Sequence, residues 1–439
     1  YTQDLPDFSS DEEGAEQPQI TAQPQDWTGS VGGTASLSVA ATVGDGGTLS
    51  YQWFTNAVNS NTGGALIGGA TNPSYSAPTT TPGTSYYYCV VTNTVAIGGT
   101  DYTATGVSRA ARVRVKSPST GNVWDGTIAT SFGGGSGTAG DPYLIATGAQ
   151  LAYLATQVNS GTAYANMYFR QTADIDLDGR EWTPIGHYVG QGGTQRPFSG
   201  TYDGDGFIIS NLKIDVTYQG TSTDNKTWAL FGNLGGVVQN LGLTEASVRA
   251  HNTNTASGNA ANAYAGTIAA YATGSIRNSY AEGSAEAISD SSSTTAPTVR
   301  AAGGLAARLS GSSSNITNSY AAVSATVDKG TYSGGLVGYN QSGGTFTNAF
   351  WNSALTSAGV ENVSSTSGTS ARTTAQMKAA AFVTDLNDGR GTDKQWMADP
   401  ANLNQGYPIH LREVGPTDIS TATIAPIPDQ TWTGSPIEP

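Results

Sequence analysis

Residues 334–351 read Gly-Gly-Leu-Val-Gly-Tyr-Asn-Gln-Ser-Gly-Gly-Thr-Phe-Thr-Asn-Ala-Phe-Trp, and three earlier segments share this pattern. The earlier copies cover residues 229–240, 267–281 and 303–321. At intervals of 38, 40 and 30 residues, the four copies share one asparagine: Asn240, Asn278, Asn318 and Asn348. Self-similarity at such periods predicts a stacked architecture, in which each repeat buries its apolar face against its neighbours.

Within each copy, apolar residues alternate with small or polar ones for a few positions before Gly or Asn interrupts the pattern. This alternation predicts short β-strands rather than helices. Gly and Asn tolerate the positive φ that sharp turns require, and the alanine pairs at 269–270 and 306–307 suit a narrow interior. We therefore expect a right-handed parallel β-helix. In it, the repeated asparagine forms a ladder of side-chain hydrogen bonds from one coil to the next.

The segment 334–351 resembles the GLUG repeat of bacterial secreted and surface proteins. Shorter motifs before it resemble the lead-in usual in that family, among them Trp-Asp-Gly at 124–126, Asp-Ile-Asp-Leu at 174–177 and Phe-Ser-Gly-Thr-Tyr-Asp-Gly-Asp-Gly at 198–206. The resemblance covers residues 122–412. It implies a β-helix in a bacterial surface protein such as an adhesin, and it fixes no activity.

Composition narrows the classes of function. Charged residues make up 12% of the 439 residues, and the formal net charge is −14 without a basic cluster. This balance argues against nucleic acid and against an anionic membrane as a partner. No apolar run has the length of a membrane-spanning helix, so we expect no membrane insertion within this segment. Scarce charge with abundant Gly, Ser, Thr and Ala is typical of β-structure with many turns.

Residues 20–116 predict a β-sandwich, because short alternating apolar segments are separated by turn-forming residues. Tyr-Gln-Trp ending at Trp53 and Tyr-Tyr-Tyr-Cys ending at Cys89 resemble a bacterial immunoglobulin-like module. The resemblance implies that Trp53 is the core tryptophan and Tyr87 the tyrosine-corner residue. Cys89 has no partner cysteine in the chain, so we expect a buried thiol without a catalytic role.

Two segments carry a helix-start signature, a Thr three residues before a Gln. They begin at Thr147 and Thr373, and we expect each to form a short helix that caps one end of the β-helix. Without caps, the open strand edges would pair with other chains. A final strand is expected within residues 405–410. The apolar residues expected to face the stack are Leu151, Leu154, Val158, Met377, Ala380, Phe382 and Leu386.

These features divide the chain into four parts. Residues 1–19 are an acidic tail or linker, 20–116 form the sandwich, and 117–413 form the β-helix. Residues 414–439 are a linker and the first strand of a further, truncated module. That last assignment rests on Trp-Thr-Gly-Ser, which occurs near both ends of the chain.

Residues able to carry chemistry are sparse. None of the three histidines has a Cys, an Asp or a second His at metal-ligand spacing. In the strongest acidic motif, Asp174, Asp176 and Asp178 alternate, so on a strand their carboxylates share one face. They are the candidate ligands of a calcium ion, although Ile185 stands where an EF-hand loop has its bidentate Glu. We otherwise expect no cofactor and no catalytic residue.

Aromatic residues recur at related positions of the repeats and offer a candidate binding surface. If they project from one outer face, they form a platform for sugar rings. If they lie at corners or point inward, they are packing residues, and the sequence leaves both readings open. The candidate ligand-binding residues are Tyr280, Tyr320, Tyr339 and Trp351.

The sequence therefore predicts a non-catalytic, secreted or cell-surface bacterial adhesin or fibre segment, in which a stiff rod presents repeated weak contacts. Its partners would be a host or environmental glycan or protein surface, or copies of itself. One alternative is a structural subunit of an extracellular filament joined through its terminal strands. Another is a carbohydrate-active β-helix enzyme that uses the three aspartates.

Overall fold

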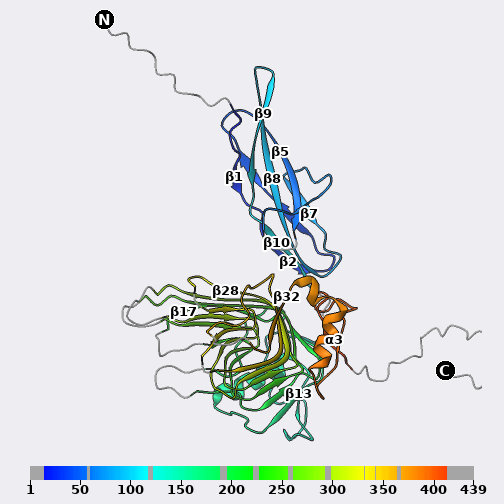
Figure 1. Ribbon diagram of the computed structural model, residues 1–439, viewed down its shortest axis with the longest axis vertical. Helices are drawn as coiled ribbons and strands as arrows, with labels where there is room; N and C mark the ends of the chain where they lie inside the picture. The colour runs from blue at the N-terminus through cyan, green and yellow to red at the C-terminus, as the bar shows by residue number, and fades with distance from the viewer. Residues whose placement is uncertain are drawn as a thin grey trace, which may run out of the picture.

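The structure is a computed structural model of the chain. It describes residues 14–56, 60–116, 122–187, 195–220, 227–255, 261–291, 298–330, 332–341, 343–362 and 367–412. These residues form mostly β-strands with three helices, which confirms the predicted all-β class. Most of the predicted acidic tail and all of the predicted C-terminal strand lie outside the described residues. Figure 1 shows an elongated N-terminal part beside a broader stack of strands.

The N-terminal β module is built mainly from antiparallel pairs. Its described strands are β1 (Gln19–Ala22), β2 (Trp27–Ser30), β3 (Ala35–Ser38), β4 (Ala40–Thr42), β5 (Thr48–Asn56), β6 (Ala65–Leu66), β7 (Ser74–Ala77), β8 (Gly83–Ile97), β9 (Thr100–Val107) and β10 (Ala111–Lys116). The largest sheet has the order β2-β10-β8-β5-β6, with β9 on β8, and β1-β4 and β3-β7 are separate pairs. Among these described strands, β2 and β10 form the one parallel pair.

The core of this module contains the tryptophan and the cysteine that the sequence predicted to be buried. Trp53 on β5 lies opposite Cys89 on β8, and both are fully buried with Leu37. The Trp53 indole Nε1 donates to the Asn72 carbonyl at 2.9 Å, so its polar atom is satisfied. The predicted buried tryptophan and buried thiol are confirmed, and burial raises the pKa of Cys89 to about 11. The immunoglobulin-like assignment stays a prediction.

The second part, called the parallel stack below, covers residues 122–372, and every pair of its described strands is parallel. Two of its sheets have the orders β18-β22-β26-β29 and β19-β23-β27-β30, and the remaining strands form one larger sheet. The strands are β11 (Asn122–Val123), β12 (Tyr143–Ile145), β13 (Tyr168–Gln171), β14 (Ile175–Asp176), β15 (Thr201–Asp203), β16 (Ile208–Ser210), β17 (Lys213–Tyr218), β18 (Thr227–Trp228), β19 (Phe231–Leu234), β20 (Val237–Gln239), β21 (Gly242–Asn252), β22 (Ala263–Gly266), β23 (Ala269–Ala272), β24 (Ser275–Arg277), β25 (Tyr280–Ser289), β26 (Arg300–Gly303), β27 (Ala306–Leu309), β28 (Asn315–Val327), β29 (Tyr332–Gly334), β30 (Val337–Asn340), β31 (Thr345–Asn352) and β32 (Thr369–Arg372).

Each sequence repeat contributes one layer. Strands β22, β23, β24 and β25 of one layer pair in register with β26, β27 and β28 of the next layer. Parallel sheets of this kind fit the predicted β-helix, and its handedness stays a prediction. Neighbouring layers lie about 4.8 Å apart, the spacing of hydrogen-bonded strands.

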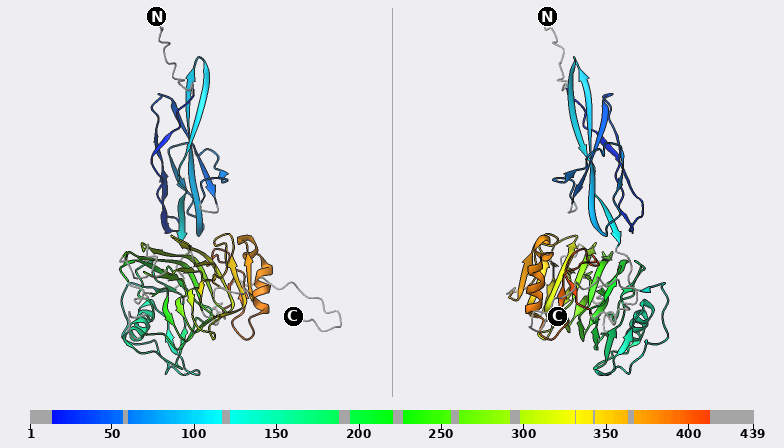
Figure 2. Two further views of the ribbon diagram at one scale, coloured as in Figure 1. Left: turned by 60° about the vertical axis from the view of Figure 1, so that its left-hand side comes forward. Right: turned by 90° about the vertical axis from the view of Figure 1, so that its right-hand side faces the viewer.

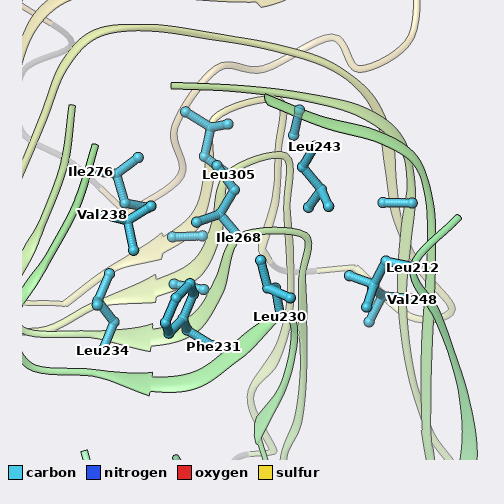
Figure 3. Packing of buried hydrophobic residues seen from close by; sticks show 14 of the residues in the cluster. Leu212, Leu230, Phe231, Leu234, Val238, Leu243, Val248, Ile268, Ile276 and Leu305 are labelled. Atoms are coloured by element: carbon cyan, nitrogen blue, oxygen red, sulfur yellow. The ribbon is translucent and has the colours of Figure 1, made fainter. Parts of the chain in front are cut away.

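Equivalent apolar residues of successive layers fill the interior. Leu230, Ile268 and Leu305 occupy matching positions, and all are fully buried (Figure 3). Phe231 lies in register with Ala269, so a large ring in one layer is followed by a small side chain in the next. Burying each aliphatic side chain contributes roughly 1.5–3 kcal/mol, which is how layers without many charges hold together.

The predicted asparagine ladder is confirmed. The Nδ2 atoms of Asn278, Asn318 and Asn348 each donate to the Oδ1 atom of the preceding asparagine, at 2.8, 2.7 and 2.7 Å. Asn240 donates in turn to Asp203 Oδ1 at 2.9 Å. All four asparagines have φ between 43° and 51°, a left-handed conformation that Asn tolerates better than most residues.

Helix α1 (Gly148–Ser160) covers the first end of the stack, as predicted. The Thr147 hydroxyl accepts from the Gln150 backbone N–H at 3.2 Å, and the Gln150 side chain accepts from the Ala146 N–H at 2.8 Å. The capping box is thus displaced by one residue from its usual form. The predicted apolar face is buried in the same cluster as the interior of the stack: Leu151, Leu154 and Val158.

The second helical segment takes a different place from the one predicted. Residues 373–412, called the C-terminal strap below, form α2 (Thr374–Met377), α3 (Ala380–Asp388), β33 (Trp396–Met397) and β34 (Ile409–His410). Thr373 and Gln376 form the expected capping box of α2. Figures 1 and 2 show α3 along the side of the strands. The strap packs on aromatic residues of the stack: Tyr280, Tyr320 and Phe350.

The expectation of a helical cap at the second end is therefore wrong. Phe382 and Leu386 are buried against the side of the stack, and Ala380, expected to be buried, is exposed. Trp351 and Val360 instead pack on the interior cluster at the last layer. A column of aromatic rings offers the strap more apolar surface than the end of a narrow interior does. The strap therefore packs against the side of the stack.

Contacts among the described residues join the N-terminal β module to the rest of the molecule. Arg114 on β10 pairs with Glu245 on β21 at 3.4 Å, and both side chains are largely buried. Glu245 has φ of 56° and lies at an irregularity in the pairing of β21 with β25, which sets it apart from the regular ladder. On the strap, Asn402 Nδ2 donates to the Pro82 carbonyl at 3.0 Å.

Candidate binding surface

The three aspartates of the acidic motif do not form one set of ligands. Asp174 Oδ2 lies 2.7 Å from Arg412 Nη1 of the strap, and its Oδ1 accepts from the Ile208 N–H at 2.8 Å. These contacts attach the strap to an early layer of the stack. They also engage both carboxylate oxygens of Asp174.

Asp176 and Asp178 point to different partners. Asp176 Oδ1 accepts from Asn211 Nδ2 of the next layer at 2.7 Å, and from the Asp178 N–H at 2.8 Å. Strand β14 ends at Asp176, and Asp178 lies in a turn with φ of 56°, so the expected common strand face does not form. The described part of the chain holds no group of three Asp, Glu, His or Cys residues suited to a metal ion. Calcium binding by these aspartates stays a prediction.

Tyr280 and Tyr320 form a covered aromatic column with Phe350. Their rings stack at 5.2 Å with an interplanar angle of 6°, and neither side chain is exposed. The Tyr320 hydroxyl accepts from Asn404 Nδ2 of the strap at 2.7 Å and donates to the Pro408 carbonyl. Burial raises the pKa of both tyrosines. The prediction of an outer sugar platform at Tyr280 and Tyr320 is corrected, because the strap occupies their outer side.

Trp351 also lies elsewhere than predicted. Its indole packs against the interior cluster, and its ring atoms lie close to the positions of Gly335 and Gly359. A Cβ at either glycine would come within 3.0 Å of the indole, so glycine makes room for the ring. Trp351 is a packing residue of the last layer that stays partly exposed.

Tyr339 does lie on an outer face. It stands in register with Arg308 of the preceding layer, and Arg308 with Tyr271 of the layer before that. All three side chains are half-buried. The Arg308 guanidinium carbon lies 5.1 Å from the Tyr271 ring centre and 5.8 Å from that of Tyr339, so the cation is held between two aromatic rings.

Residues of the neighbouring sheet complete this surface. Tyr332 lies 4.4 Å from Tyr339, ring centre to ring centre. Arg308 Nη1 donates to the Tyr264 hydroxyl at 3.1 Å, and Arg308 Nε donates to Gln341 Oε1 at 2.9 Å. Burial raises the pKa of Tyr264, and Arg308 partly offsets that effect. The Tyr–Arg patch is defined here as Tyr264, Tyr271, Arg308, Tyr332, Tyr339 and Gln341.

Sequence reasoning missed Arg308, although the repeats contain its signal. When the copies are aligned, Ile-Ala-Ala-Tyr ends at Tyr271, Leu-Ala-Ala-Arg ends at Arg308, and Leu-Val-Gly-Tyr ends at Tyr339. A cation thus replaces an aromatic residue at one repeated position. Because repeated positions align across parallel layers, the alignment alone places this arginine between two tyrosines.

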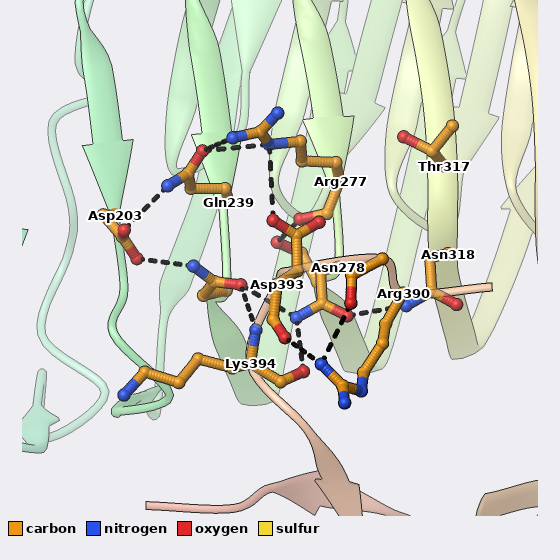
Figure 4. A network of polar contacts seen from close by, with 12 residues as sticks. Asp203, Gln239, Arg277, Asn278, Thr317, Asn318, Arg390, Asp393 and Lys394 are labelled. Atoms are coloured by element: carbon orange, nitrogen blue, oxygen red, sulfur yellow. Dashed lines mark hydrogen bonds and ion pairs between the residues drawn. The ribbon is translucent and has the colours of Figure 1, made fainter. Parts of the chain in front are cut away.

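A polar cavity of about 890 Å³ lies where the strap crosses the asparagine ladder. Figure 4 shows its network: Gln239 Nε2 donates to Asp203 at 2.7 Å, and Arg277 Nε donates to Gln239 Oε1 at 2.9 Å. Arg277 also lies 4.0 Å from Asp393, whose pKa is raised by burial. Lys394 pairs with another carboxylate at 2.9 Å. These groups attach the strap to the stack. The polar residues that line the cavity therefore have a structural role.

Two known proteins are similar to parts of this chain. Halomucin of Haloquadratum walsbyi is 38% identical over 138 residues, which cover 28% of this chain and 1% of halomucin. A putative Gly-rich membrane protein of Evansella cellulosilytica is 34% identical over 121 residues, which cover 26% of this chain and 12% of that protein. The chain therefore matches only a small part of each relative.

The other comparisons give no match. No protein-family model matches the chain, and no solved structure is significantly similar to it. Within the described residues, no helix has the length and apolar character needed to cross a membrane.

Proposed function

We propose that this chain is a non-catalytic segment of a secreted or cell-surface bacterial protein, an adhesin or fibre. In this proposal an immunoglobulin-like module is followed by a GLUG-type β-helix. The partial similarity to a protein named as a membrane protein is compatible with a cell-surface role. The ligand is a glycan or a protein surface, bound at the Tyr–Arg patch.

One observation carries the proposal: in-register parallel layers present side chains from successive repeats in straight columns. The asparagine ladder and the interior apolar columns tie each layer to the next. A body built in this way is stiff, because bending it would break hydrogen bonds in several sheets at once. Stiffness keeps neighbouring contacts at fixed spacing, and linked weak contacts gain avidity without any new interaction.

The alternative of a carbohydrate-active enzyme has less support. Its best candidate acids were Asp174, Asp176 and Asp178, and an acid–base pair needs carboxylates that face a substrate together. Asp174 pairs with Arg412, and Asp176 accepts from Asn211. These contacts favour a structural role for the motif.

The alternative of a filament subunit depends on residues 1–19 and 416–439, most of which lie outside the described residues. Light scattering of the full chain and of a variant without residues 416–439 tests it. A multimer that dissociates on this truncation would support the filament, and a monomer in both cases would remove it.

A glycan-array screen tests the proposed binding function. The full chain is compared with Tyr339→Ala, which removes a ring of the Tyr–Arg patch, and with Tyr168→Ala. Tyr168 on β13 is 38% exposed and lies outside the patch, so it is a matched control. We expect binding by the wild type and the control and its loss in Tyr339→Ala. Equal binding by all three proteins, or binding by none, would overturn the proposal.

A further inference from the structure

Arg308 differs in its partners from Arg249 and Arg277, two other arginines of the stack. Arg249 lies 3.1 Å from Asp215, and Arg277 lies 4.0 Å from Asp393. Within the described residues Arg308 has no ion pair, and it donates hydrogen bonds to neutral oxygens of glutamine and tyrosine. In a chain with a net charge of −14, a guanidinium kept apart from carboxylates is available to an anion from outside.

The Arg308 guanidinium is held in place and still has donors to offer. Nε and Nη2 donate to Gln341 Oε1, and Nη1 donates to the Tyr264 hydroxyl. These bonds occupy three of the five N–H groups that an arginine carries. The rings of Tyr271 and Tyr339 flank the side chain, so it loses little conformational freedom when a ligand binds. A planar, positioned guanidinium with two remaining N–H groups suits a carboxylate.

We infer that the Tyr–Arg patch binds an acidic polysaccharide, with Arg308 pairing with a carboxylate of one sugar. The inference rests on the proposed function, because it names the ligand class of the same surface. The half-buried rings of Tyr271, Tyr332 and Tyr339 contact the apolar C–H groups of the sugar units. Tyr271 and Tyr339 are two layers apart, about 9 to 10 Å, so they contact different units of one polysaccharide chain.

The surroundings of Arg308 favour a sugar over an acidic peptide. The close ring pair of Tyr332 and Tyr339 gives an aromatic surface, which is typical of sugar sites. An extended peptide binds by adding a strand to a free sheet edge. Strand β27, which carries Arg308, is paired on both sides by β23 and β30, so its edges are occupied.

Titration calorimetry with the full chain tests the inference, with three polymers as probes. These are polygalacturonate, the same polymer with its carboxyl groups reduced to alcohols, and polyglutamate. We expect polygalacturonate to bind with an affinity that falls as salt is added. The reduced polymer and the variant Arg308→Gln should each weaken binding about tenfold or more, the effect of losing one charge-assisted pair. Arg249→Gln, on another face of the stack, should leave binding unchanged.

The outcomes separate this inference from the proposed function. If the reduced polymer binds as well as polygalacturonate and Tyr339→Ala still abolishes binding, the acidic ligand class is wrong and the binding function stands. If polyglutamate binds as tightly and loses affinity in Arg308→Gln, the partner is an acidic protein and the inference is overturned. If no probe binds and the glycan array is also empty, both fail. A cooperative thermal unfolding transition in each variant verifies that it is folded.

Discussion

The parallel stack carries two aromatic columns that differ in their exposure to solvent. One consists of Tyr280, Tyr320 and Phe350, which stand in register and are covered by the C-terminal strap. The other contains Tyr271 and Tyr339, separated by Arg308, and remains half-exposed. Both arise from the same repeats and the same layer spacing.

The difference lies in what covers each column. The strap supplies its own rings to the first column, including Trp396 within 5.5 Å of Tyr320, centre to centre. No such segment of the described chain lies over Arg308, whose neighbours are the rings of the patch and Gln341. Stacked repeats thus generate ordered columns, and a separate segment decides which column becomes core and which stays available to a ligand.

The largest effect should come from emptying the covered column. Tyr320→Ala removes a fully buried ring and takes from Asn404 Nδ2 its shorter hydrogen bond, so we expect a loss of about 3–5 kcal/mol in the free energy of unfolding. Tyr339→Ala in the exposed column should cost about 1 kcal/mol. Chemical denaturation of both variants measures the difference. Equal losses would show that both columns serve packing.

Acid should weaken the covered column through His410 of the strap. Burial lowers the pKa of His410 to about 3, the Asn278 carbonyl that accepts from its Nε2 opposes this shift, and Arg412 and Lys394 add to it. The unfolded chain takes up the proton near pH 6.5, so the stability is complete above that pH and falls as the pH drops toward 3. At pH 4 the loss should be about 3 kcal/mol.

Thermal unfolding at pH 7 and pH 4 measures this loss. In His410→Asn the group that titrates is gone, so we expect the variant to lose less stability on acidification than the wild type does. An unchanged difference between the two pH values would exclude His410 as the cause. Tyr–Arg patch variants should keep the acid sensitivity of the wild type, because Arg308 bonds to Gln341 and Tyr264 of the stack and not to His410.

The asparagine ladder, which runs beneath the strap, should give a smaller effect. Asn278→Gly keeps a residue that accepts positive φ but removes the amide that bonds to Asn240 and Lys394. Because buried partners lose their bonds, we expect a loss of about 2 kcal/mol in unfolding free energy by chemical denaturation. Asn166→Gly is the control, since Asn166 has φ of 61° but is exposed. Comparable losses in both variants would show that the ladder adds nothing beyond local backbone conformation.

The smallest effect on stability should come from the centre of the exposed column. Arg308→Gln removes a half-exposed cation whose bonds go to neutral groups. The free energy of unfolding should therefore fall by less than about 1 kcal/mol. Differential scanning calorimetry checks this value. A loss as large as that of Tyr320→Ala would make the Tyr–Arg patch a structural element and end the contrast between the columns.

Much of the fold follows from the repeats themselves. The spacing of the asparagines predicts the ladder, and the Thr147 signature predicts α1, because both depend on local backbone conformation and on layer-to-layer register. The position of the strap could not be predicted in the same way. It packs on Tyr280 and Tyr320 from positions far along the chain, and no periodicity links the two segments.

The candidate site was predictable only in part. Tyr339 was identified as a candidate, whereas the sequence left open whether Tyr280 and Tyr320 are exposed or packed, because periodicity gives alignment but not the covering partner. The predicted common face of the acidic motif failed because Asp178 leaves the strand in a left-handed turn. Arg308 was predictable in principle from its place among the repeats.

The asparagine ladder has a direction. Each amide donates toward the preceding layer, and the series finishes on Asp203, whose Oδ1 accepts from Asn240. In a duplicated repeat inserted after Asp203, the ladder asparagine would lie between an amide donor of the following layer and an oxygen acceptor of the preceding layer. This holds whatever the length of the loops in that repeat. The stack can therefore gain or lose whole repeats while the contacts between layers stay the same. Gene duplication alone can then change the length of the stack.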